Sequence, residues 1–509
     1  YSYSYVVTAI DAEGVSESVA SAVANCTGNL FTTGFKITIS WSAVAGASRY
    51  NIYKLQGGLY GYIGQTAGLS IVDDNIAPDL SKTPPIYDSP FSGAGNYPAA
   101  VSYFEQRRCL AGTTNKPQNI WMTKSGTESD MSYSLPIRDD DRIAFRVAAR
   151  EANTIRHIVP LSGLVLLTSG AEWRVTSINS DAITPSSISV RPQSYVGASN
   201  VQPVIVNNTL LYCAARGGHV RELGYQQDAA GFITNDVCLR APHLFDGLEI
   251  VDMAYAKAPQ PVAWFVSSAG RLLGLTYVPE QQVGAWHWHD TADGVFESCA
   301  VVAEGDEDML YVVVRRTVDG NSVRYVERLE SRRFAAQDDA YFVDCGATYT
   351  GAPASTITGL GHLEGKLVNI LADGAVHPQR VVSGGSITLD VAASTVQVGL
   401  PITSDLQTLP IAAPLRDGSF GQAHVKNINK AWLRVHRSSG IFVGPDFDRL
   451  REVKQRTDEP YGSPPALKSE EMSINLTPSW GDGGQVCVRQ SDPLPLTIVS
   501  LTVEVEIGG

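Results

Sequence analysis

Short runs of β-branched and aromatic residues recur along the whole of this 509-residue chain, and most of them are closed by Gly, Asn, Asp or Pro. Runs of about four to eight such residues, often alternating with polar ones, are typical of β-strands that end in turns. Sustained helical periodicity with capping residues is nearly absent. The sequence therefore predicts an all-β protein. Representative runs are 36–41, 143–147, 164–168, 262–266, 310–314 and 496–507.

Length and charge narrow the class of protein. At about 150 residues per domain, the chain has room for about three to four domains. Apolar residues make up 44% and charged residues only 18%, a balance that argues against disorder. The net charge of −13 argues against a general nucleic-acid clamp, because phosphate binding needs a basic field. The longest uncharged apolar stretch, 158–171, is shorter than the ~20 residues of a membrane span, so we expect no stable membrane insertion.

Seven scattered cysteines form no C-x-x-C pair, which predicts reduced thiols buried as small apolar side chains. The chain begins at Tyr1 in the middle of a strand pattern, as we expect for a segment of a longer polypeptide.

Candidate metal ligands occur in the segment 286–290, where His287 and His289 share one face of a predicted strand. A metal would find two ligands there, but no third ligand stands at a characteristic spacing. We therefore predict a strand that buries its tryptophan face, with Trp286 and Trp288, and exposes its histidine face.

Acidic clusters at 138–142 and 304–308 lack the D-x-D-x-D-G pattern of calcium loops, and both are predicted to be solvated turns. The segment 361–366 has Gly and Lys, but Leu367 follows where a phosphate loop needs Ser or Thr, so a β-turn is predicted. Nucleophile-elbow and His-Glu-x-x-His motifs are absent. Accordingly, no catalytic, cofactor-binding or metal-binding residue is assigned, no cofactor is expected, and the chain is predicted not to be an enzyme.

Arginine outnumbers lysine, and arginines occur in adjacent pairs at 107–108, 315–316 and 332–333. Arginine forks bind carboxylates in bidentate fashion, which suits subunit interfaces in an acidic protein. Ordinary pairing within the chain is the alternative.

The N-terminal region resembles fibronectin type III modules. Tyr3, Tyr5, Asp11 and Gly14 follow the pattern of the last two strands of such a sandwich, and Trp41 with the segment 45–53 resembles the B and C strands of a second one. We therefore predict the end of one fibronectin type III-like domain over 1–27, and a second such domain with a Pro/Gly-rich linker over 28–97.

The remaining chain is divided by its strand density and charge. Closely spaced strands with Gly-Arg and Asp-Gly turns predict a β-propeller-like core over 98–345. A small β domain is predicted to be inserted over 346–418, and the strands of 419–509 are predicted to return to the core.

Ordered motifs in the core together resemble the tail nozzle (tail tubular protein B-like) family of short-tailed bacteriophages. They are YFEQRRCLAG at 103–112, LLTSGAEWRV at 166–175, ITPS at 183–186, Arg221, Glu222 and Tyr225, Ala254, Tyr255 and Trp264, GRL at 270–272, Thr276 and Tyr277, AWH at 285–287, and PLPL at 493–496.

The resemblance implies a structural virion protein of the phage tail that is assembled in the host bacterial cytoplasm. Such a subunit forms a homohexameric ring below the portal and adaptor, through which genomic DNA passes without sequence-specific binding. The implied partners are further copies of the chain, the head-to-tail adaptor protein, and tail fibre or spike proteins.

Two other classes fit the predicted modules. The first is a tail-associated receptor-binding protein or polysaccharide depolymerase, which predicts a pocket with aromatic platforms and paired carboxylates. The second is a secreted bacterial β-propeller adhesin or lyase. Neither explains the ordered motifs as well.

Overall fold

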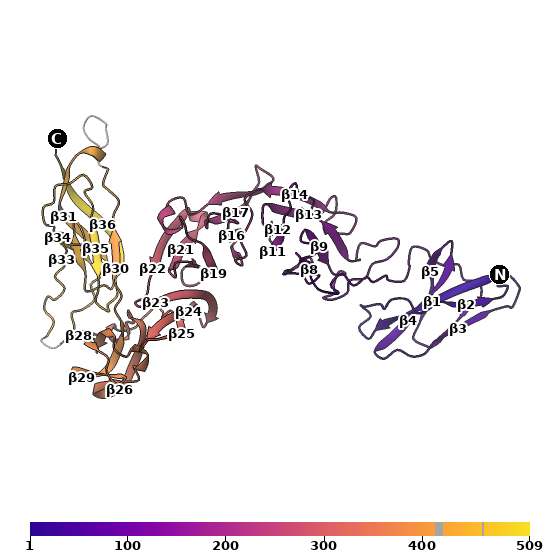
Figure 1. Cartoon of the computed structure of the whole chain (residues 1–509), viewed down its shortest axis with the longest axis horizontal. Helices are drawn as coiled ribbons and strands as arrows, with labels where there is room; N and C mark the ends of the chain where they lie inside the picture. The colour runs from indigo at the N-terminus through magenta and orange to yellow at the C-terminus, as the bar shows by residue number, and fades with distance from the viewer. Residues whose placement is uncertain (413–420, 461–462, 509) are drawn as a thin grey trace. The chain divides into compact units, whose positions relative to one another are not determined.

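The computed structural model describes residues 1–412, 421–460 and 463–508. These residues form small antiparallel sheets joined by loops and single 3₁₀ turns (Figure 1), so the predicted all-β class is confirmed. No helix in this part of the chain is both long and apolar enough to cross a membrane. Two compact units divide the chain, Tyr1–Met253 and Ala254–Gly509, and each is described in turn.

The first unit begins with a two-sheet sandwich. One sheet has the order β2-β1-β4-β5 and the other pairs β3 with β6. Tyr5, Ile39, Ile52 and Ile63 come from both sheets and are buried together between them. The strands are β1 (Ser2–Asp11), β2 (Ala24–Thr27), β3 (Ile37–Ser40), β4 (Ala47–Gln56), β5 (Leu59–Thr66) and β6 (Ser70–Asp73).

The predicted domain boundary between residues 27 and 28 is not a boundary in the structure. β1 pairs with β4 over most of its length, from Tyr5 opposite Lys54 to Asp11 opposite Ala47. In an immunoglobulin-like sandwich the C strand lies beside the F and G strands. β1 and β2, which have the pattern of the last two strands of such a sandwich, lie in one sheet with β4, which has the pattern of the C strand. They therefore belong to the same sandwich as β4 and share its core. One fibronectin type III-like domain results.

The predicted linker after this sandwich is partly folded. Ile86 forms a β-bridge with Tyr133, and the Leu135 amide donates to Thr83 Oγ1 at 3.1 Å. These bonds tie the segment to a loop of the following sheet.

Three four-stranded sheets follow in the first unit. In each, strands that are neighbours in sequence are neighbours in the sheet, which is the up-and-down construction of propeller blades. Core sheet 1 comprises β7 (Ala100–Phe104), β8 (Arg107–Ala111), β9 (Asn119–Met122) and β10 (Ile143–Arg146). Core sheet 2 comprises β11 (Ile155–Pro160), β12 (Leu164–Thr168), β13 (Glu172–Thr176) and β14 (Ser189–Ser194). Core sheet 3 comprises β15 (Val204–Val206), β16 (Thr209–Cys213), β17 (Val220–Gln226) and β18 (Gly231–Asp236).

The strand β12 shows how these sheets stack. Successive side chains of a strand point to opposite faces. Leu164 and Leu166 join the apolar core shared with core sheet 1, whereas Val165 and Leu167 join the core shared with core sheet 3. All four are fully buried. The uninterrupted apolar run at 164–168 therefore reflects a strand covered on both faces, and the predicted propeller-like core is confirmed.

Gly112 lies where core sheet 1 approaches core sheet 2. Its φ of +70° is left-handed, and an added Cβ would lie 2.3 Å from the Ile155 carbonyl oxygen. We expect Gly112→Ala to destabilise core sheets 1 and 2 by about 2 kcal/mol, from the backbone conformation and the overlap together. Hydrogen exchange of peptides from β8, β9 and β11 measures the loss.

Gly126 provides the matched control, since its φ is +74° but no atom lies within 4 Å of its added Cβ. Gly126→Ala should cost only the conformational part, about 1 kcal/mol. Equal effects of the two substitutions would contradict the close approach at Gly112.

Two further core sheets belong to the second unit, with β19 spanning the boundary between units. Core sheet 4 comprises β19 (Ile250–Ala256), β20 (Val262–Ser267), β21 (Leu272–Val278) and β22 (Val283–His289), and core sheet 5 comprises β23 (Gly294–Glu304), β24 (Glu307–Val318) and β25 (Asn321–Arg328). One apolar core joins the two sheets, with Trp264 and Val266 from core sheet 4 and Leu310 and Val314 from core sheet 5.

The predicted small β domain is one sheet of order β26-β29-β27-β28 with its own core. Its strands are β26 (Asp344–Thr358), β27 (Leu367–Ala372), β28 (Ala375–Val381) and β29 (Ser386–Leu400). The segment 361–366 holds a 3₁₀ turn, Gly361–Leu363, whose Leu363 is buried. A turn is therefore what this glycine-rich segment forms.

The C-terminal strands form two sheets, β30-β35-β32-β33 and β34-β31-β36, which share a core. They are β30 (Ser404–Gln407), β31 (Lys426–Val435), β32 (Phe442–Gly444), β33 (Arg451–Glu452), β34 (Glu471–Asn475), β35 (Cys487–Gln490) and β36 (Ile498–Ile507). The predicted boundary at 418 lies outside the described residues. β30 precedes that boundary yet pairs with β35, so 404–407 belongs with the C-terminal strands.

The prediction that the C-terminal strands return to the core sheets is wrong for the described residues. β31 pairs with β34 and β36, and β35 pairs with β30 and β32. The inner faces of the two sheets bury each other, so these strands fill a core of their own. The short 3₁₀ turns elsewhere are Pro242–Leu244, Pro279–Gln281, Gln337–Asp339 and Gly421–Ala423.

Candidate functional site

Several of the motifs that carry the family resemblance lie on hairpins of the core sheets. Residues 103–112 span the β7–β8 hairpin, 166–175 span β12–β13, and 270–272 form the turn between β20 and β21. The buried polar residues of these motifs are candidates for a functional site, because a buried polar group needs a hydrogen-bond partner or a function.

Arg107 in the first motif is buried and binds backbone oxygens. Its Nη1 donates to the carbonyls of Thr123 at 2.8 Å and Asp141 at 2.6 Å, and its Nη2 donates to that of Asp139 at 2.8 Å. Burial lowers the pKa of Arg107. This arginine therefore organises the acidic turn at 138–142 and is not available to a subunit interface.

The prediction of a solvated acidic turn holds for Asp139 and Asp140, which are exposed, but is wrong for Asp141. Its side chain is buried and accepts hydrogen bonds from the backbone amides of Ser134 and Arg138, both at 2.8 Å. The carboxylate closes the turn instead of facing solvent. Within the described residues, no three His, Cys, Asp or Glu side chains are grouped to hold a metal ion.

Glu172 in the second motif links core sheets 2 and 3. It is fully buried and accepts hydrogen bonds from Ser194 Oγ and from the Tyr212 hydroxyl, the latter at 3.0 Å. Burial, followed by the charge of Glu172, raises the pKa of Tyr212. The hydrogen bond between Glu172 and Tyr212 therefore connects the two sheets, and Glu172 belongs to the resemblance motif at 166–175.

The histidine pair on β22 faces into the protein. His287 lies opposite Gly274, and His289 lies opposite Leu272, on the sheet face that carries Trp264. The imidazole rings stand 5.5 and 5.7 Å from the Trp264 ring and 5.1 Å from each other, measured between ring centroids. Both Nε2 atoms are buried and lack a hydrogen-bond partner among the described residues.

Burial dominates the titration of both rings. It lowers the pKa of His287 to about 4 and that of His289 to about 3, and the charge of Arg332 adds to both shifts. Both imidazoles are therefore neutral at pH 7.

The predicted orientation of β22 is thus wrong. The histidines face core sheet 5 and Trp288 is 44% exposed under the Arg271 guanidinium. Only Trp286 follows the prediction, since it is partly buried against the Phe265 ring. Alternation correctly predicted that the two histidines share one face of the strand, but it did not predict which face is covered. Gly274 was the available signal, because a glycine inside a strand marks close approach of a neighbouring group, here the His287 ring.

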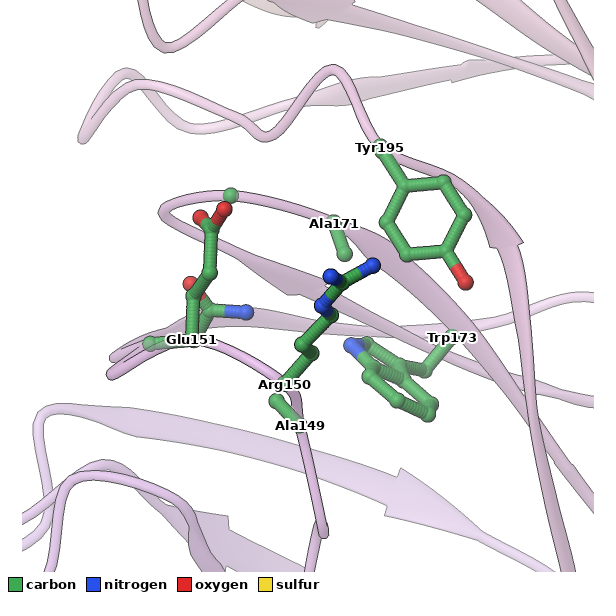
Figure 2. A pocket seen from close by; sticks show the side chains of 8 residues that line it. Ala149, Arg150, Glu151, Ala171, Trp173 and Tyr195 are labelled. Carbon is green, nitrogen blue, oxygen red and sulfur yellow. The ribbon is translucent and has the colours of Figure 1, made fainter.

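A surface pocket of about 390 Å³ lies at one end of core sheet 2. Three connections line it: the loop after β10 with Arg150 and Glu151, the β12–β13 turn with Gly170, and the end of β14 with Tyr195. Trp173 from β13 forms part of its wall, and its indole nitrogen is turned toward Arg150 (Figure 2). Sequence reasoning singled out the segment 166–175 but assigned no pocket to it.

The prediction of buried cysteines is confirmed for five of the seven residues, whereas Cys26 and Cys345 are only partly buried. All seven cysteines are free thiols.

No protein-family model and no curated protein matches the sequence. Among solved structures, a luciferin-regenerating enzyme aligns at 12% identity over 43% of this chain and 83% of its own, with a TM-score of 0.20. A protein from Lactobacillus plantarum aligns at 9% identity over 71% and 98%, with a TM-score of 0.25. The Nup133 β-propeller domain of Vanderwaltozyma polyspora aligns at 10% identity over 65% and 90%, with a TM-score of 0.22. At these scores, the fold assignment rests on the strand pairings of the chain itself.

Proposed function

We propose that this chain is a structural subunit of a phage tail nozzle, part of a homohexameric ring that forms the distal conduit for DNA ejection. One observation supports the proposal most: motifs of the resemblance lie on strands and turns of core sheets 1 to 4, in the order in which these sheets follow along the chain. Arg107 and Glu172, from two of those motifs, hold a turn and a sheet-to-sheet contact. These two residues of the resemblance motifs hold the stacked sheets together, which is what a structural role needs.

The acidic composition suits a conduit. A channel for DNA must not retain it, and carboxylates repel phosphates within about 10 Å at moderate salt. We propose that acidic side chains line the bore of the ring, with the adaptor and the tail fibres or spikes as partners in the virion. The proposed role involves no reaction and no cofactor.

The oligomeric state tests the proposal. We expect mass photometry of the purified chain, alone and with the adaptor, to show a species of six subunits, and electron-microscopy class averages to show six-fold rings with an open bore. A trimer, or a monomer that persists with the adaptor at micromolar concentration, would overturn it. A six-fold ring with a basic bore would overturn only the proposal that acidic side chains line the bore.

A further inference from the structure

A buried polar group without a partner lines the pocket at the end of core sheet 2. Trp173 is 7% exposed, and its Nε1 is buried without a hydrogen-bond partner in the described part of the chain. Asn153, which also lines the pocket, is 7% exposed. A buried donor without an acceptor is destabilising, so each such group in a native structure calls for an explanation.

Charged and aromatic groups complete the lining. Arg150 and Glu151 are exposed, and neither is in an ion pair within the described residues. Arg150 extends between the Tyr195 and Trp173 rings, and the Glu151 carboxylate lies on the opposite side of the pocket (Figure 2). Tyr195 is 76% exposed. The pocket thus offers a guanidinium, an indole N–H, a carboxylate and an open aromatic ring.

These groups define the chemistry of an occupant. Arginine binds a carboxylate in bidentate fashion, and the indole N–H donates to an oxygen. A carboxylate such as Glu151 accepts hydrogen bonds from hydroxyl groups, and an exposed tyrosine ring packs against an apolar face. A sugar acid carries a carboxylate, several hydroxyls and a C–H face on one ring. The pocket volume lies near the lower end of the ~300–1,000 Å³ typical of ligand sites, which suits one such ring.

We propose that this pocket binds an acidic monosaccharide unit of a polysaccharide, with Arg150 and Trp173 on its carboxylate and Tyr195 against its ring. The site is independent of the proposed nozzle role, since it lies within one chain.

Binding of short acidic oligosaccharides tests the assignment. The probes are trigalacturonate, a glucuronate trisaccharide and sialyllactose, compared with galactotriose and a triglutamate peptide. We expect saturable binding of at least one acidic saccharide to chain 1–509 by isothermal titration calorimetry. The neutral sugar and the peptide should bind at least tenfold more weakly.

Variants separate the contacts. We expect Arg150→Gln to weaken binding at least tenfold, Tyr195→Ala several-fold, and Trp173→Phe, which keeps a ring but removes the N–H, several-fold. Gly170→Ala should also weaken binding, because its Cβ would lie 2.6 Å from Asn153 Oδ1. Arg216→Gln, an exposed arginine outside the pocket, should change nothing. Hydrogen exchange of β12 and β13 checks that each variant is folded.

Three results would overturn the assignment: no binding of any acidic saccharide, binding that Arg150→Gln and Tyr195→Ala leave unchanged, or equal binding of triglutamate. Mass photometry of the same samples tests the nozzle proposal separately, because it measures the oligomeric state. A failure of the saccharide-binding proposal is therefore distinguishable from a failure of the nozzle proposal.

Discussion

Arg316→Ala is expected to destabilise core sheet 5 and its junction with the small β domain by about 3–5 kcal/mol, the range for removing one partner of a buried ion pair. Arg316 on β24 is 3% exposed. Its Nη2 lies 2.7 Å from Glu327 Oε2 and 3.0 Å from Asp344 Oδ1, and its Nη1 donates to Thr291 Oγ1. Burial alone would lower the pKa of Arg316, but the bonds to Glu327 and the charge of Asp344 raise it.

The cost arises from the groups left behind. Without the guanidinium, the carboxylates of Glu327 and Asp344, which are 18% and 19% exposed, keep their charge in a poorly solvated site. A destabilisation of this size corresponds to amide exchange about 100-fold faster or more in β23–β25. Hydrogen exchange with mass spectrometry measures it locally, which matters because a multidomain chain need not unfold in one step.

Arg315, the adjacent residue on β24, is the matched control. It is 46% exposed and pairs with Glu297 on the surface, so Arg315→Ala should change stability by less than about 0.5 kcal/mol. A second variant, Arg316→Met with Glu327→Gln and Asp344→Asn, removes all three charges and should recover much of the loss. If both arginine variants behave alike, the charges at Arg316 do not stabilise the fold as argued.

The arginine pairs show what sequence can and cannot give. Arg315 and Arg316 are adjacent in a strand, so alternation predicts that their side chains lie on opposite faces. Which arginine is buried depends on Asp344, which is 28 residues away and follows the last core strand. The same limit applies to β22, where alternation grouped the histidines correctly and the neighbouring sheet decided that they are covered.

Domain assignment failed for a related reason. Each strand of the N-terminal sandwich was recognisable, but Tyr5 and Ile52 share a core only because β1 and β4 pair. Strand patterns group the residues that share a face, and they leave open which strand or sheet packs against that face. The pocket was missed because Arg150, Trp173 and Tyr195 come from the loop after β10, from β13 and from the end of β14, which the sequence does not show to be adjacent.

Acidification is expected to destabilise the contact between core sheets 4 and 5 through His287 and His289. Burial keeps the pKa of these rings at about 4 and about 3 in the folded state, against about 6.5 in the unfolded chain. Between the pKa values of the folded and the unfolded state, the unfolded state therefore binds more protons than the folded state. The free energy of unfolding falls as the pH drops below about 6.5. The contribution is fully present above about pH 7.5 and lost toward pH 3. At about 1.4 kcal/mol per pKa unit, the pair accounts for a loss on the order of 6 kcal/mol at pH 4.

The double variant His287→Leu with His289→Leu isolates this loss from other titrating groups. Neither Nε2 has a partner in the described residues, so replacing both rings with apolar side chains should change stability little at pH 8. At pH 4 the double variant should be more stable than the wild type, in urea unfolding followed by tryptophan fluorescence, because Trp264 contacts both rings. His243→Leu, at an exposed position, should leave the pH difference unchanged. An acid loss of equal size in the wild type and the double variant would show that the buried pair does not control it.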